Sequence, residues 1–179
     1  MNQLLDRTEV LTPADHQTHR RHVFDVPAGC SQLRIAFEYT PKLLPLDQSA
    51  ALVRAAVDQH AVFLTGRLAS DSELVADWRT AVEAVLREAG TPSIPNLLTI
   101  SLDDAAGTYR GAVHRQQPRQ VLVLRRRSAS PGLLRGALPA GPWSLTVSVH
   151  TLVTPTCTYR VQIGAETARS TSSGPRSSA

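Results

Sequence analysis

The sequence has few aromatic residues and no long apolar run. No stretch approaches the roughly 18–20 consecutive apolar residues that a membrane span needs, so we expect no membrane association. The first residues lack the basic-then-apolar layout of a secretory signal peptide, which makes a cytoplasmic location the default expectation. Aromatic residues form only 4% of the chain. The regular stacking platform that single-strand nucleic-acid binders use is therefore not visible.

Cysteine is also scarce, with only Cys30 and Cys157 in 179 residues. The two could form at most one disulfide, and that alternative stays open. In a chain without an export signal we expect two free thiols, with Cys157 packed as a small apolar side chain. Without a disulfide framework the fold must rely on its own core, and the length suffices for one well-buried core.

The strongest pattern that is present is an alternation of apolar and polar residues from 143 to 163, interrupted at Pro155. A period of two places alternate side chains on opposite faces, which predicts two half-buried antiparallel strands. Shorter alternating runs predict further strands at 22–26, 31–39, 97–103, 108–114 and 120–127. The chain is therefore mainly β, and about seven to eight strands predict a jelly-roll-like β-sandwich.

The period changes to helical spacing after the prolines at 41–45. An alanine-rich segment predicts a helix over 47–64, and a second helix is predicted over 71–89. Ser70 and Glu73 form a capping-box pattern at its start, and Gly90 followed by Pro92 ends it. We expect an inserted two-helix hairpin at about residues 46–90.

The two ends of the chain lack a clear hydrophobic period. Residues 1–18 are polar, and we expect a flexible N-terminal arm there. Residues 167–179 are rich in Ser, Gly and Pro, and we expect a disordered tail because they hold too little apolar surface to bury. The β-sandwich domain is predicted to span 19–166, with the helical insertion inside it.

Three segments together resemble the N-terminal β-sandwich domain of bacterial PHP-type (polymerase and histidinol phosphatase) metallohydrolases. They are Val-Phe-Asp-Val-Pro-Ala-Gly with the following strand at 23–39, Leu-Leu-Thr-Ile-Ser-Leu-Asp-Asp-Ala-Ala-Gly-Thr-Tyr-Arg-Gly at 97–111, and Ala-Ser-Pro-Gly-Leu-Leu-Arg-Gly-Ala-Leu-Pro-Ala-Gly-Pro-Trp at 129–143. The resemblance covers most of residues 20–165. It implies a fold and a kinship, since these are turn and strand signatures rather than chemical motifs.

The catalytic domain of that family opens with a His-x-His metal motif, which this sequence does not contain. Nothing catalytic is carried over by the resemblance. It implies a non-catalytic binding or interaction module, either free-standing or an orphaned or truncated N-terminal domain. The sequence itself shows no catalytic residues and implies no cofactor.

Three histidines, His16, His19 and His22, are spaced three residues apart, and imidazole is a common transition-metal ligand. The spacing would gather them on one face of a helix. The strand pattern from residue 22 favours an extended segment, which would scatter them. They are therefore weak metal-ligand candidates, and a small metal-dependent hydrolase is the weakest of the functional hypotheses.

Basic residues dominate the second half of the chain, because residues 105–179 hold ten arginines and one acid, Glu166. Guanidinium groups bind phosphate and carboxylate in a bidentate manner. The densest arginines are therefore candidates for anion binding: Arg115, Arg119, Arg125, Arg126 and Arg127. They support an alternative function, a basic protein that binds nucleic acid or another polyanion, with weak affinity for nucleic acid.

The leading hypothesis remains a binding or interaction module. A domain that lacks the catalytic neighbour of its relatives is expected to expose the surface that the neighbour covered. We therefore expect either a protein partner or self-association into a homo-oligomer.

Overall fold

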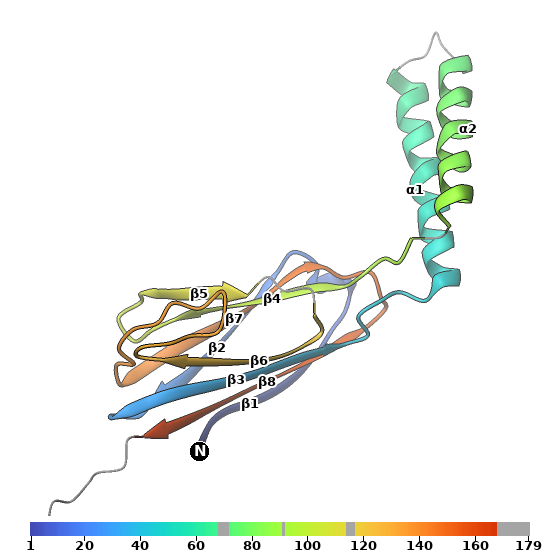
Figure 1. Ribbon diagram of the computed structural model, residues 1–179. Coiled ribbons are helices and arrows are strands. Elements are labelled where there is room, and N and C mark those ends of the chain that lie inside the picture. Colours follow the sequence, from blue (N-terminus) through green and yellow to red (C-terminus); the bar gives the residue numbers. More distant parts are fainter. Residues whose placement is uncertain (68–71, 91, 114–116, 168–179) are drawn as a thin grey trace, which may run out of the picture. The chain divides into compact units, whose positions relative to one another are not determined.

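The computed structural model describes residues 1–67, 72–90, 92–113 and 117–167. The chain divides into two compact units, one formed by Met1–Thr40 with Leu97–Ala179 and the other by Pro41–Asn96. The first is a β-sandwich and the second a helical hairpin (Figure 1). This confirms the mainly β fold with two inserted helices.

The sandwich consists of two four-stranded antiparallel sheets with the orders β1-β8-β3-β6 and β2-β7-β4-β5. In this arrangement the chain crosses from one sheet to the other at nearly every connection, as in a jelly roll. The β3–β4 connection contains the hairpin. The strand bounds are Asn2–Leu11 (β1), His19–Val26 (β2), Cys30–Thr40 (β3), Leu97–Asp103 (β4), Tyr109–Val113 (β5), Arg119–Arg125 (β6), Gly141–Thr151 (β7) and Cys157–Thr167 (β8).

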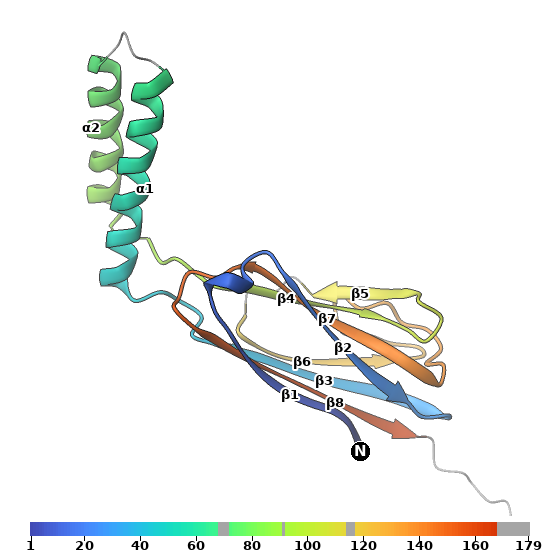
Figure 2. The same ribbon diagram turned by 180° about the vertical axis from the view of Figure 1, so that it is seen from behind.

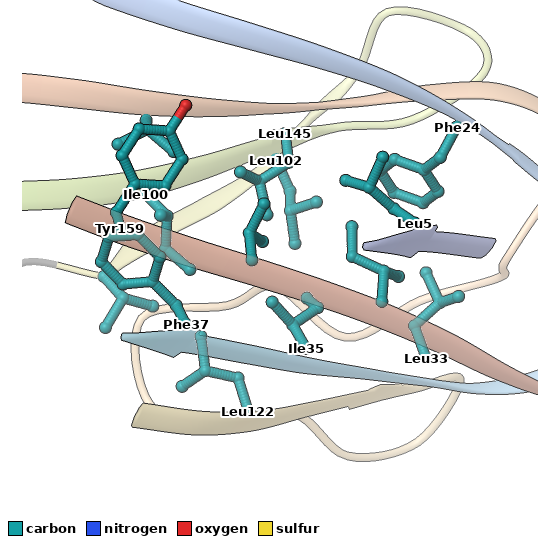
Figure 3. Close-up of a cluster of buried hydrophobic side chains, with 14 of the residues drawn as sticks. Leu5, Phe24, Leu33, Ile35, Phe37, Ile100, Leu102, Leu122, Leu145 and Tyr159 are labelled. Carbon is teal, nitrogen blue, oxygen red and sulfur yellow. The ribbon is translucent and has the colours of Figure 1, made fainter. Parts of the chain in front are cut away.

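Alternation along each strand places one apolar row between the sheets. The side chains of Ile35, Leu102 and Leu145 point into this layer from three different strands (Figure 3). Trp143 and Tyr159 are the largest fully buried side chains. Burial of apolar area on this scale is the main stabilising contribution to the sandwich.

The predicted N-terminal arm is wrong, because residues 2–11 form β1. This strand pairs antiparallel with β8 along its whole length and lies at the sheet edge (Figure 2). Two charged residues, Arg7 and Glu9, occupy positions opposite the buried Val161 and Tyr159, on the inward side of the strand. The apolar alternation is therefore interrupted, although the backbone is a strand. Inward charges on an edge strand also discourage pairing with a further chain.

The hairpin consists of α1 (Leu46–Arg67) and α2 (Ser72–Ala89). Their bounds agree with the expected helices to within a few residues. At the base, the Leu44 amide donates to the Ile94 carbonyl, and the Lys42 ammonium donates to the Asn96 carbonyl, both at 2.9 Å. Gly90 follows α2 with a φ of +75°, the left-handed conformation in which helices commonly end. Ser70 of the predicted capping box lies outside the described residues.

Three further expectations concern single features. Neither Cys30 nor Cys157 forms a disulfide, as expected, and Cys157 is buried in the core. Burial raises the pKa of the Cys30 thiol. No helix among the described residues is long and apolar enough to span a membrane. The predicted disordered tail comprises residues 167–179. Thr167 is the last residue of β8, and the rest of the tail lies outside the described residues.

Candidate interaction surfaces

The three N-terminal histidines do not form a common site. His16 accepts a hydrogen bond at Nδ1 from the Leu152 amide, at 3.3 Å. His19 and His22 are three residues apart on β2 and therefore point to opposite faces, His19 to solvent and His22 to the interior. In the described part of the chain, no three His, Cys, Asp or Glu side chains are grouped so that they could hold a metal ion.

The polar outer face of the β2-β7-β4-β5 sheet contains two histidine–hydroxyl pairs. His19 Nδ1 lies 3.0 Å from Ser148 Oγ, and His150 Nε2 lies 2.7 Å from Thr99 Oγ1. A nucleophilic serine needs a base that a third group, usually a carboxylate, holds in place. No carboxylate hydrogen bonded to His19 or His150 is seen among the described residues, so these pairs do not extend to a triad.

The candidate arginines are not gathered on one patch either. Arg119 and Arg125 begin and end β6, roughly 20 Å apart for six residues of strand. Arg119 donates to Glu38 at 3.0 Å and Arg125 to Gln32 at 2.6 Å. Arg126 and Arg127 are exposed in the following bend, and Arg115 lies outside the described residues.

A buried arginine holds two of the segments on which the family resemblance rests. Arg110 donates to the carbonyls of Ala137 (2.8 Å) and Leu134 (3.1 Å), and its guanidinium lies 5.2 Å from the centre of the Trp143 ring. It also pairs with Asp104 at 3.3 Å. We call these the Arg110 cluster. All the contacts of this cluster lie inside the protein. They therefore indicate that these residues stabilise the fold, and they do not indicate a catalytic role.

A second internal network lies where β1 and β2 approach each other. The Tyr159 hydroxyl donates to Glu9 Oε2 at 2.7 Å and lies 2.8 Å from His22 Nε2. Since its single proton goes to Glu9, it accepts from His22, which is therefore protonated at Nε2. Burial lowers the pKa of His22, and burial together with the bond to Glu9 raises the pKa of Tyr159 far above its usual range. The network stabilises the edge strand.

The hairpin presents an exposed apolar surface. Leu52, Val62 and Phe63 are 42%, 73% and 52% exposed, respectively. Helical spacing places them on the side of α1 opposite Val53 and Val57, which are half-buried. We define the α1 stripe as Leu52, Ala55, Ala56, Gln59, Val62 and Phe63, all exposed and none charged.

The second helix has the usual two-sided character. Its half-buried side chains include Val75, Trp78 and Val82, and Trp78 packs against His60 of α1 with ring centres 5.1 Å apart. Asp58 of α1 accepts from Arg79 of α2 at 2.8 Å. Charged residues are spread over the rest of α2, although Leu74 and Val85 are 51% and 62% exposed. Within the hairpin, the charge-free outer side is therefore a property of α1.

A hollow of about 630 Å³ lies on the outer face of the β1-β8-β3-β6 sheet. Residues of all four strands line it. The register places Thr8, Arg160, Glu38 and Arg119 in one row across the sheet. Thr158 and Thr40 face each other in the neighbouring row. Smaller hollows around Ala36 and Gly164 lie on the same face.

Each arginine of the row is paired with a carboxylate. Asp6 accepts two bonds from Arg160, at 2.9 and 2.7 Å, and one from Gln162 at 3.0 Å. The hydrogen bonds from Arg160 and Gln162 lower the pKa of Asp6 to about 2. Glu38 stands between Arg160 and Arg119. Opposite charges therefore alternate, which does not favour a polyanion.

Of the row, the sequence identified only Arg119. The other members sit on different strands and form no local motif, so only the strand order brings them together. The alternating pattern could have assigned Arg160 and Glu38 to the outward face, but it could not place Thr8 of β1, and it could not show that these residues are neighbours. Comparison with family models found no match to this chain, and comparison with curated proteins found no similar sequence.

Proposed function

We propose that the protein is a non-catalytic interaction module that associates with a second copy of itself through its helical hairpin. The observation that supports this proposal is the α1 stripe, which consists of six exposed residues without a charge. The opposite side of the same helix already packs against α2. A contiguous exposed surface without charge is typical of a site that a protein partner covers.

A second copy fits the stripe better than a charged partner. The stripe offers no charge to pair with, and its large apolar side chains lie near its two ends, Leu52 at one and Val62 with Phe63 at the other. An antiparallel two-fold packing brings Leu52 of each copy against Phe63 of the other. The smaller Ala55 and Ala56 lie between these ends and let the helices approach.

The expected affinity follows from the size of the surface. Leu52 to Phe63 spans about 17 Å of helix, at about 1.5 Å for each residue. Such a stripe buries several hundred Å² in total, which belongs to the weak class of interfaces. We therefore expect a dissociation constant of about 10–100 µM.

The test is the mass of the full chain in solution, measured by light scattering or sedimentation from a few micromolar upwards. The wild type is expected to shift from monomer to dimer. The L52K/V62K variant is expected to stay monomeric, because it places four charges in the two-fold interface. The matched control, V23K/L134K, changes two sandwich residues of similar exposure, 57% and 53%.

Circular dichroism must show unchanged helix content in both variants, so that loss of the dimer reports the surface and not unfolding. A wild type that stays monomeric, or a control that loses the dimer as L52K/V62K does, contradicts the proposal. If the wild type stays monomeric but a separate hydrolase chain binds the stripe, the partner is another protein. The reading frames beside the gene test independently whether the protein is related to PHP-type hydrolases.

A further inference from the structure

The hollow on the sandwich has a chemistry of its own, distinct from that of the α1 stripe. We propose that the outer face of the β1-β8-β3-β6 sheet binds a small polyhydroxylated carboxylate, a ligand with the functional groups of a sugar acid. The site is the row Thr8–Arg160–Glu38–Arg119 with Thr40 and Thr158 beside it, which we call the threonine–arginine row.

Unused donors define the first half of the ligand. Arg119 uses only its Nε, toward Glu38, and its side chain is 83% exposed. Arg160 gives Nε and Nη2 to Asp6. Within the described residues, both Nη groups of Arg119 and Nη1 of Arg160 thus have no hydrogen-bond partner. A guanidinium with two parallel N–H groups recognises a carboxylate.

Unused acceptors define the second half. Glu38 accepts from Arg119 through Oε2, which leaves Oε1 open. A carboxylate side chain only accepts, so a ligand at Oε1 must donate. The hydroxyls of Thr8, Thr40 and Thr158 form no hydrogen bond with any described residue, and each can donate and accept. This combination suits neighbouring hydroxyl groups on the ligand.

Size and charge narrow the class further. The hollow of about 630 Å³ falls in the range of roughly 300–1,000 Å³ that is usual for small-molecule sites. Asp6 and Glu38 balance the two arginines of the row, so a multiply charged anion gains little. Phosphate and sulfate also lack the neighbouring hydroxyl donors that Glu38 and the threonines call for. One carboxylate with several hydroxyls matches both requirements.

The probe is glucuronate, titrated into the full chain and followed by amide chemical shifts in a ¹H–¹⁵N spectrum. Saturable shifts are expected at Thr8, Thr40 and Thr158, with a dissociation constant of about 1 mM because the hollow is open. Glucose lacks the carboxylate and acetate lacks the hydroxyls. Each is expected to bind at least tenfold more weakly.

Two variants locate the ligand. R119Q is expected to weaken glucuronate binding about tenfold or more, since it removes charge-assisted bonds. T158V, which removes one hydroxyl at constant shape, should weaken it several-fold. The matched control is R125Q, at the other end of β6, which should bind within twofold of wild type.

Several results would overturn the proposal. They are no saturable shift with glucuronate, shifts as large with acetate or glucose, binding of inorganic phosphate at least as tight, and equal effects of R119Q and R125Q. The ligand site lies in the sandwich unit and the α1 stripe in the hairpin unit. Failure of one test therefore leaves the other unaffected, and L52K/V62K should still bind glucuronate.

Discussion

Removing the charged side chain of Arg110 should destabilise the sandwich far more than removing an exposed arginine. The side chains of Arg110 and Asp104 are only 6% and 9% exposed. The guanidinium donates to Asp104, Ala137 and Leu134, and it covers one face of the Trp143 ring. In R110M, two carbonyls and one carboxylate lose these bonds.

The magnitude follows from those losses. Breaking a buried ion pair by removing one partner costs about 3–5 kcal/mol. The Asp104 carboxylate keeps the amides of Ala106 and Thr108, each at 3.0 Å, which limits the loss. We therefore expect R110M to lower the free energy of unfolding by about 3 kcal/mol. That is a large part of the roughly 5–15 kcal/mol typical of a domain.

Equilibrium unfolding in urea measures this loss. Trp143 is the natural reporter, because it is fully buried beneath the guanidinium, and the experiment is done in a W78F background so that it is the only tryptophan. R127M changes an exposed arginine and should stay within about 0.5 kcal/mol of its parent. A loss below about 1 kcal/mol in R110M would refute the argument.

Four further predictions concern other parts of the molecule. Burial lowers the pKa of His22, so the folded state binds fewer protons than the unfolded state as the pH falls below about 6.5. The urea midpoint should drop between pH 7.5 and pH 5.5, and Y159F should lose about 1–3 kcal/mol; an unchanged midpoint would speak against the network. G111A should destabilise by more than about 2 kcal/mol, because its φ is +107° and the new Cβ would overlap the backbone of Gly132. G29A shares the positive φ (+73°) but has nothing within 4 Å of the new Cβ, so its smaller loss on unfolding isolates the effect of the overlap. Elemental analysis should find no stoichiometric transition metal. One zinc per chain that is lost in H16A/H19A/H22A would contradict the conclusion that these histidines form no metal site. Binding to DNA should be weak and lost near physiological salt, as an anisotropy titration at two salt concentrations can check.

Alternation and helical spacing in the sequence were enough to predict most of the fold. The alternation from Trp143 to Ile163 predicted two strands that the structure contains as β7 and β8. Both helices were predictable from their spacing and their Gly and Pro boundaries. These signals are local, because the period of the side chains follows directly from the backbone conformation.

β1 could not be predicted, because its inward positions include charges. Glu9 is tolerated there because the Tyr159 hydroxyl, distant in sequence, donates to it and Arg20 lies 4.0 Å away, and Arg7 is exposed. A register shift between Gln3 and Leu5 also changes the phase of the strand. A strand of this kind is determined by its neighbours.

The candidate sites divide in the same way. The α1 stripe can be read from sequence, because residues three and four apart share a face of one helix. The threonine–arginine row cannot, since its members come from four strands. Only the order β1-β8-β3-β6 and its register make Thr8, Arg160, Glu38 and Arg119 neighbours. For the strands with a regular alternation, the sequence by itself determined which residues face outward. The pairing of distant strands decided which of them meet, because strand pairing depends on contacts far apart along the chain.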